Sequence, residues 1–544
     1  MHSIEIVLTM LLLVLASGYL VRVLPMALPL PLVQIALGAG VAAVSNHGVQ
    51  LDPDLFFILF LPPLLFLDGW RVPKAGLLHE AGSILQLALG LVVFTVVGVG
   101  LFVHWLVPAM PLAVAFALAA IVSPTDPVAV SAIATRVPLP RRLLHILEGE
   151  ALLNDATGLV CFRFAVIAAV TGEFSLLSAG LAFLWLALAG LAVGALVSWG
   201  IGRGHHLLTR RFGQDAGLPV LSSLLTPFGA YLAAEHLGAS GILAAVAAGV
   251  MMSQAEMSGV APPTTRLQRA AVWDSVQFAL NGIAFVLLGE QLPGILQRAT
   301  SDGGSEGGPG SVWWLLLLAL ALYLALSVLR LAWTLAALHL RTVWRKRRGE
   351  DAARPPWRLV LAMSLSGVRG AVTLAGVLTL PLMLPDGSAF PSRDLAIFLA
   401  MSVIVLSLLV ASFALPRLLL GLRVLPEPGA HRQEDLARRH AARAALAAIE
   451  VALRDPTDGK ADAGIEAAAA SRVIALYQSR LDGSDTDIDA GRLRKADQAE
   501  RQLRLAALRA ERAELLALAR QGRLADDVAR RLVREVDFVE ARYQ

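Results

Sequence analysis

The fold is decided by the stretch Ser123-Pro124-Thr125-Asp126-Pro127, which interrupts an otherwise apolar run of residues. Each proline removes a backbone hydrogen-bond donor and clashes with the preceding turn, so a helix that crosses this stretch must unwind there. At membrane depth an unwound segment is tolerated only where protein or a water-filled cavity satisfies its backbone. Backbone oxygens beside a carboxylate are suitable ligands for a hard monovalent cation. The stretch therefore predicts a broken transmembrane helix with an ion site at Asp126, a role compatible with capping of the next half-helix.

The whole chain has the composition of a membrane protein. Of its 544 residues, 56% are hydrophobic and only 16% are charged, against about 25% charged residues in a typical soluble protein. A bilayer core roughly 30 Å thick requires about 20 apolar residues per helical span. Thirteen such runs are centred near residues 13, 36, 62, 92, 122, 158, 188, 227, 246, 284, 325, 371 and 406. The predicted fold class is all-α, a polytopic membrane protein with about thirteen transmembrane helices.

The charged residues divide the chain into two parts. From Pro426 to Gln544 the chain holds 21 of its 46 Lys and Arg residues and 21 of its 42 Asp and Glu residues. Residues 1–425 are therefore predicted to form the transmembrane domain, and residues 426–544 a water-soluble tail of amphipathic helices. A small bundle and a surface for dimerisation or regulation fit the tail equally well.

Basic residues predict the orientation in the membrane. If the N-terminus lies outside, the cytoplasmic loops hold 18 Lys and Arg residues and the opposite loops hold two, Arg298 and Arg393. Such a bias follows the positive-inside rule and places the C-terminal tail in the cytoplasm. The net charge of +4 is too small to indicate a nucleic-acid partner. The single cysteine, Cys161, excludes an intrachain disulfide and a CxxC metal or redox site.

Ionisable residues inside the apolar runs are candidates for function, because a charge at mid-membrane costs at least about 2.5 kcal/mol. The sixth run contains Glu148, Glu150, Asn154 and Asp155. Glu150 and Asn154 share one helix face, so Asp155 lies on a neighbouring face. Arg369 in the twelfth run is the expected partner of Glu150, because an unpaired buried charge costs far more than a pair.

The twelfth run is interrupted from Gly367 to Gly370, as the fifth is at Pro124. The two broken runs hold corresponding positions, the fifth of runs one to six and the fifth of runs eight to thirteen. Matching interruptions in two halves indicate an inverted-repeat transporter with a site near the bilayer midplane. A desolvated carboxylate there can hold either a proton or a cation, which is the chemical requirement for exchange.

Four motifs together resemble those of the bacterial sodium/proton exchangers in the monovalent cation:proton antiporter-1 (CPA1) family. They are Thr125-Asp126-Pro127-Val128-Ala129-Val130, Glu150-Ala151-Leu152-Leu153-Asn154-Asp155, Gly367-Val368-Arg369-Gly370-Ala371 and Leu61-Pro62-Pro63-Leu64-Leu65-Phe66. The resemblance covers about residues 1 to 420. It implies a homodimer with a core domain that moves as an elevator, electroneutral exchange of one Na⁺ for one H⁺ because of the Asn-Asp pair, and a role in pH and sodium homeostasis at the bacterial inner membrane.

The resemblance also assigns roles to residues of this chain. It implies that Asp155 carries the ion and the proton, that Thr125 and Asp126 line the site and that Asn154 steadies it. Na⁺ is expected at Asp155 and Asp126 as the transported ion, with no cofactor. Structural and accessory candidates are the pair Glu150 and Arg369, then Asp68, Glu148 and Arg163. Weaker candidates, for pairs behind the site or at an interface, are Asp274, Asn281 and Glu290 in the tenth run and Arg330 in the eleventh.

Two positions depart from the family pattern. Ala151 stands where many members have serine, so a hydroxyl ligand is missing. Leu67, followed by Asp68, stands where members often carry an acid. Both positions bear on ion coordination and on the choice among Na⁺, K⁺ and Li⁺.

Other functions fit parts of the sequence. A K⁺/H⁺ exchanger differs only in selectivity, and a passive channel or sensor would conduct net charge. The stretch Gly238-Ala239-Ser240-Gly241 resembles the GxSG motif of rhomboid proteases, but no mid-membrane histidine follows it to complete a dyad. A tight turn between helices is the favoured interpretation over an intramembrane hydrolase. The protein is not expected to be an enzyme, and its expected partners are Na⁺, H⁺, the lipid bilayer and a second copy of itself.

Overall fold

The structure is a computed structural model, and the chain forms two compact units, Met1–Val424 and Leu425–Gln544. The residues that it describes are 2–23, 28–44, 53–72, 81–126, 141–172, 176–212, 217–257, 262–301, 311–347, 356–420, 430–454, 469–475, 477–478, 487–521, 523–524 and 526–541. The predicted boundary between residues 425 and 426 lies outside these residues.

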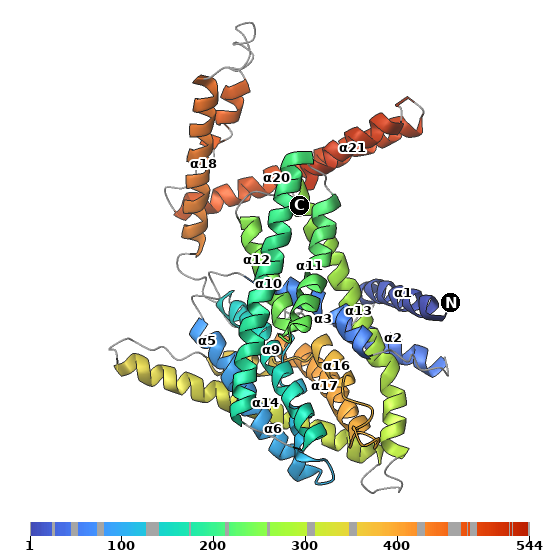
Figure 1. Ribbon diagram of the computed structural model, residues 1–544. Helices are drawn as coiled ribbons and strands as arrows, with labels where there is room; N and C mark the ends of the chain where they lie inside the picture. Colours follow the sequence, from blue (N-terminus) through green and yellow to red (C-terminus); the bar gives the residue numbers. More distant parts are fainter. Residues whose placement is uncertain are drawn as a thin grey trace. The chain divides into compact units, whose positions relative to one another are not determined.

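The first unit is built from helices (Figure 1). In chain order they are α1 (His2–Val23), α2 (Leu30–Val44), α3 (Pro53–Arg71), α5 (Ala81–Leu85), the π-helix η1 (Gln86–Leu91), α6 (Val92–Leu106), α7 (Leu112–Val122), α9 (Arg141–Thr171), α10 (Leu176–Phe212), α11 (Gly217–His236), α12 (Gly241–Met257), α13 (Pro263–Ser301), α14 (Val312–Arg347), α15 (Trp357–Leu365), α16 (Ala371–Leu378) and α17 (Arg393–Leu419). No strand occurs among the described residues, and the predicted all-α membrane fold is confirmed.

The centre of every predicted apolar run lies on one of these helices. Within the described residues, eight helices are long and apolar enough to cross a membrane, and α2, α7 and α12 are shorter apolar helices. That thirteen segments cross the bilayer stays a prediction. The predicted interruptions are present: α7 ends at Val122, and residues 366–370 separate α15 from α16. Residues 127–140, which include Pro127, lie outside the described part of the chain.

The helices of the first unit pack as two groups. In one group, α2 packs on α13, α3 on α12, and α10 on α11 and α12, which Figure 1 shows alongside one another. In the other, α7 packs on α6 and α9, and α17 packs on α14, α15 and α16. The two groups meet where α3 contacts α9 and α16 and where α13 contacts α16 and α17. The broken helices α7 and α15–α16 therefore belong to one group, and α3 and α13 belong to the other.

Glycine allows α3 and α12 to approach closely. A Cβ on Gly69 would lie 2.4 Å from the backbone oxygen of Val246, and one on Gly249 would lie 2.0 Å from that of Phe66. Only a residue without a side chain fits at either position. This reciprocal contact fixes the last turn of α3, which carries Asp68.

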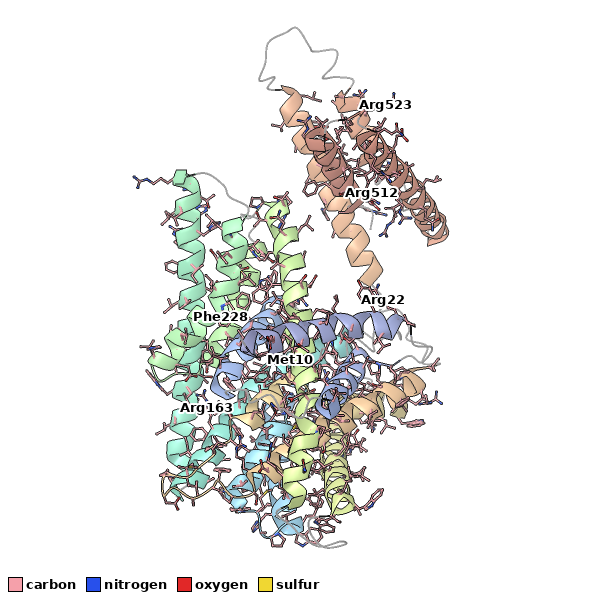
Figure 2. All side chains as sticks on the ribbon, turned by 90° about the vertical axis from the view of Figure 1, so that its right-hand side faces the viewer. Met10, Arg22, Arg163, Phe228, Arg512 and Arg523 are labelled. Carbon is pink, nitrogen blue, oxygen red and sulfur yellow. The ribbon has the colours of Figure 1, made fainter. Side chains whose placement is uncertain are left out.

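The second unit contains α18 (Ala430–Arg454), α20 (Asp487–Arg520) and α21 (Asp526–Ala541). Helices α20 and α21 pack together. Arg512 of α20, labelled in Figure 2, bonds to Asp537 of α21 at 3.0 Å and also to Glu540. The Glu540 side chain is only 4% exposed. This ion-pair cluster sets the register between the two helices.

Candidate functional site

The two broken helices are joined at their interruptions. The backbone N–H of Asp126 donates to the carbonyl oxygen of Val368 at 2.7 Å. Arg369 donates from Nε to the carbonyl oxygen of Val122 at 2.9 Å and from Nη1 to that of Gly367. These carbonyls lie at the C-terminal ends of α7 and α15, where helices carry partial negative charge and unpaired acceptors. Arg369 is 4% exposed, so its positive charge is matched mainly by helix ends.

Asp126 lies at the crossing beside the N-terminal end of α16, whereas Arg369 contacts the C-terminal ends of α7 and α15. A Cβ on Gly370 would lie 1.7 Å from Oδ2 of Asp126, so the carboxylate rests directly against the residue that precedes α16. The first turn of a helix carries partial positive charge from N–H groups without intrahelical partners. The N-terminal end of α16 therefore presents partial positive charge to the Asp126 carboxylate.

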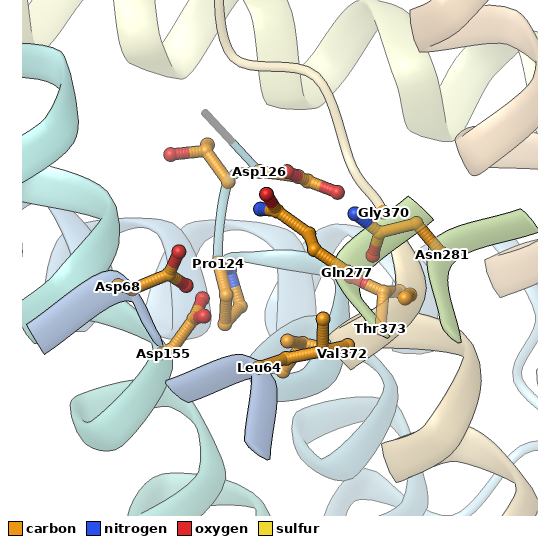
Figure 3. Close-up of a pocket in the computed structure, with 12 residues that line it drawn as sticks. Leu64, Asp68, Pro124, Asp126, Asp155, Gln277, Asn281, Gly370, Val372 and Thr373 are labelled. Carbon is orange, nitrogen blue, oxygen red and sulfur yellow. The ribbon is translucent and has the colours of Figure 1, made fainter. Parts of the chain in front are cut away.

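A small cavity at this crossing gathers three carboxylates (Figure 3). Its volume is about 20 Å³, enough for a particle the size of one water molecule. Its lining comes from α3, α9, α13, the start of α16 and the segment after α7: Leu64, Asp68, Pro124, Thr125, Asp126, Asp155, Gln277, Asn281, Gly370, Ala371, Val372 and Thr373. The cavity lies between the two helix groups, since each group supplies part of the lining.

The structure brings the predicted ion-binding residues together. Asp155 of α9 is 5% exposed and interacts electrostatically with Asp68 and Asp126. Thr125 lines the same cavity, and its Oγ1 accepts a hydrogen bond from Nδ2 of Asn154 at 2.9 Å. Asn154 itself stands behind the lining, consistent with a positioning role. That these residues bind an ion stays a prediction.

The structure corrects the predicted partner of Glu150. Glu150 bonds to Arg330 of α14 through both carboxylate oxygens: Nη2 lies 2.8 Å from Oε2, and Nη1 donates to Oε1. The two side chains are 1% and 6% exposed. A planar guanidinium suits this two-point contact. Arg369, the predicted partner, instead directs its donors to the carbonyls of the broken helices.

Of the accessory candidates, Asp68 and the weaker candidate Asn281 line the cavity. Glu148 is half-buried on α9 and does not belong to the lining. Arg163 forms an ion pair with Glu235 of α11 at 3.0 Å, apart from the cavity. Leu67 is buried in an apolar cluster, so Asp68 is the residue of α3 that supplies an acid to the site.

Gln277 was not identified from the sequence. It lies four residues before Asn281 on α13, so both polar side chains share one face of a largely apolar helix. This spacing was the available signal. Oε1 of Gln277 accepts a hydrogen bond from Nη1 of Arg71 at 2.6 Å, and Arg71 also pairs with Asp274. The link ties the end of α3 to α13 beside the cavity.

Ser240 has a structural role in its turn. Its Oγ accepts a hydrogen bond from the backbone N–H of Leu243 at 3.3 Å, which caps the start of α12. Gly238 has a φ of 62°, as expected in a tight turn. The favoured interpretation of this stretch as a turn agrees with these contacts.

Comparison with known proteins identifies similar sequences over most of the chain. The family description "Sodium/hydrogen exchanger, transmembrane" matches residues 8–421. The uncharacterised Na⁺/H⁺ exchanger YjcE of Escherichia coli is 41% identical over 98% of both chains. A sodium, potassium, lithium and rubidium/H⁺ antiporter of Bacillus subtilis is 43% identical over 76% of this chain and 60% of its own length.

Among solved structures, the sodium proton antiporter MjNhaP1 of Methanocaldococcus jannaschii has a similar fold. The TM-score is 0.58 at 18% sequence identity, over 78% of this chain and 99% of that one. At this identity the likeness concerns the fold alone.

The Glu150 contacts predict a specific energetic coupling. Glu150→Ala should lower stability by about 3 to 5 kcal/mol because it leaves the buried Arg330 guanidinium without its counter-ion. The double variant Glu150→Leu/Arg330→Leu should recover much of this loss. Thermal unfolding of the detergent-purified protein measures both. A larger recovery in Glu150→Leu/Arg369→Leu than in the Arg330 double variant would contradict the observed pairing.

The contact at Gly370 predicts a steric effect. Gly370→Ala places a methyl group where the Asp126 carboxylate lies, so the crossing must shift at a cost of about 1 to 3 kcal/mol or more. Gly200→Ala is the matched control, because a Cβ there meets no atom within 4 Å. Thermal unfolding should show a lower midpoint for Gly370→Ala only; equal midpoints would contradict the packing at the crossing.

Proposed function

The chain belongs to the sodium/hydrogen exchanger family, and we propose that it exchanges Na⁺ for H⁺ at the cavity beside the crossing of its two broken helices. The observation that carries the proposal is the meeting of Asp68, Asp126 and Asp155 around a space for one water-sized particle. A cation of that size would contact several carboxylate oxygens at once.

The coupling arises from competition for the same carboxylates. Three acidic groups in one small, buried cavity repel each other, and either a bound cation or a bound proton reduces that repulsion. Both ligands occupy the same oxygens, so each excludes the other at Asp155. The start of α16 places partial positive charge beside the Asp126 carboxylate. Asp155 lies in the middle of α9, and in this proposal it is the carboxylate that alternates between Na⁺ and H⁺. Exchange of one Na⁺ for one H⁺ then moves no net charge.

Movement of one helix group past the other would expose the cavity to each side of the membrane in turn. The location of the cavity supports this elevator proposal, because Thr125, Asp126 and Asp155 belong to one group and Asp68, Gln277 and Asn281 to the other. We propose that the helix group containing α3 and α13 also forms the interface of a homodimer in the bacterial inner membrane. The proposed orientation has the N-terminus outside and the tail in the cytoplasm.

A K⁺/H⁺ exchanger is the second candidate. The printed name of the Bacillus subtilis relative includes potassium, lithium and rubidium beside sodium. Exchange measured in sealed vesicles with Na⁺, Li⁺, K⁺ and Rb⁺ at several pH values decides between narrow and broad selectivity. The appearance of electrical current without a pH response would indicate a channel instead.

Asp155→Asn should abolish exchange while the protein remains folded, because the amide can neither release a proton nor neutralise a cation. The measurement is cation-driven recovery of a quenched pH dye in proteoliposomes, with gel filtration as the folding check. Asp386→Asn, which makes the same chemical change in the exposed loop between α16 and α17 and outside the cavity lining, is the matched control and should exchange normally. Normal exchange by Asp155→Asn would overturn the assignment.

Asp68→Asn should weaken the apparent affinity for Na⁺ by at least about tenfold, because one of three nearby negative charges is lost. Asp68→Glu retains the charge and should restore most of the affinity. The half-saturating Na⁺ concentration of exchange measures both variants. If Asp68→Asn and wild type have the same half-saturating concentration, Asp68 does not contribute to ion binding.

A further inference from the structure

A second, much larger cavity lies among α10, α11, α12 and α13, all of which belong to the helix group that contains α3. Its volume is about 840 Å³, within the range of pockets that bind organic ligands. None of its lining residues belongs to the carboxylate cavity described above. The ion-exchange proposal gives this cavity no role.

Five basic side chains belong to the lining: Arg203, His205, His206, Arg210 and Arg269. Arg269 and His206 act electrostatically on His205, so these groups are close enough to repel one another when charged. Glu256 is the one acidic residue among the described residues of the lining. The cavity therefore carries an excess of positive charge that an anion would offset.

Arg269 has a donor to spare. Its side chain is 7% exposed, and Nη1 donates to Oε1 of Glu256 at 2.8 Å. The other oxygen of Glu256 accepts a hydrogen bond from Nε1 of Trp70 at 2.8 Å. Nε of Arg269 is buried and has no hydrogen-bond partner among the described residues. A buried guanidinium donor without an acceptor is costly, which indicates that a bound group supplies one.

Part of the lining is apolar and lies on a helix with an apolar exposed surface, while hydroxyl and amide side chains fill much of the remainder. Trp199, Met251 and Met252 line the cavity. Trp199 is also 59% exposed, and Leu207 and Leu208 on the same helix are equally accessible. These residues belong to the segment Gly180–Arg211, which is apolar enough to cross a membrane. The cavity thus combines a cationic part with a wall that continues onto a surface suited to acyl chains.

We propose that this cavity binds an anionic phospholipid from the bilayer, with the phosphate at Arg203, Arg210 and Arg269 and an acyl chain along Trp199 and Met252. Basic pockets between transmembrane helices on the cytoplasmic side suit lipid headgroups of this charge. Tryptophan beside the headgroup level is the residue expected at a membrane interface. A free phosphate would satisfy the arginines but would leave the apolar wall uncovered.

The charge of the cavity is tested with two matched double variants of the full-length protein. Arg203→Gln/Arg210→Gln removes two charges from the lining; Arg211→Gln/Arg266→Gln removes two charges from α10 and α13 outside it. Native mass spectrometry in detergent counts bound phosphatidylglycerol and phosphatidylcholine. Each basic residue contributes about fivefold to binding of an anionic lipid, so phosphatidylglycerol binding should fall on the order of 25-fold in the first variant and remain unchanged in the second.

The apolar part is tested by filling it without a change of charge. Gly202 lines the cavity and Gly204 does not, and a Cβ on either meets no atom within 4 Å. Gly202→Phe should reduce phosphatidylglycerol binding, whereas Gly204→Phe should not. Thermal unfolding of wild type with phosphatidylglycerol, phosphatidylcholine or inorganic phosphate completes the test, and only phosphatidylglycerol should raise the midpoint.

Several outcomes would overturn the proposal. Equal binding of the two lipids would show that the basic residues do not select the headgroup. Equal losses in the test and control variants would place the lipid elsewhere. Stabilisation by inorganic phosphate as strong as that by phosphatidylglycerol would identify an anion site without a lipid. Because none of these measurements involves transport, failure here is distinguishable from failure of the exchange proposal.

Discussion

The crossing of the two broken helices is the constraint on which the rest of the structure depends. Unwound backbone inside a membrane leaves polar groups that cost several kcal/mol each when unpaired. Here the groups satisfy one another: Asp126 donates to Val368, and Arg369 donates to carbonyls at the ends of two half-helices. The positive side chain lies at negative helix ends and the negative one at a positive end. The break is therefore stable and holds the adjoining carboxylates at the cavity.

Packing around the crossing determines which acids reach it. Helix α9 brings Asp155 to the cavity and, on the preceding turn, Glu150 to Arg330. Neutralising Glu150 within its own ion pair separates it from the acids of the cavity. The same helix thus supplies one carboxylate to a fixed ion pair and one to the cavity. Glu150 is not a fourth acid of the cavity, even though it lies only five residues from Asp155.

The sequence predicts this site well where local chemistry decides the outcome. Prolines and glycines identify both interruptions, and the acidic motifs identify Asp126, Asn154 and Asp155, because these features depend on nearby residues. The partner of Glu150 depends on how α14 packs, and both Arg330 and Arg369 were suitable by charge alone. Gln277 lies in no motif, and its place follows from the contact of α13 with the crossing. In the sequence, the basic residues around the large cavity indicate only the orientation in the membrane. That they line one cavity depends on how α10 and α13 pack, which the sequence does not reveal.

The departure at Leu67 and Asp68 shows how a shift by one residue changes the meaning of a motif. Consecutive residues of a helix point about 100° apart. Leu67 is buried in the apolar cluster that contains Phe66 and Trp273, whose rings stack with centroids 5.2 Å apart. An acid at position 67 would enter that apolar cluster, and burying its charge among apolar side chains would be costly. Asp68 faces the carboxylate cavity instead. In this chain, the close packing of α3 on α12 at Gly69 and Gly249 therefore decides which position of the motif faces the cavity.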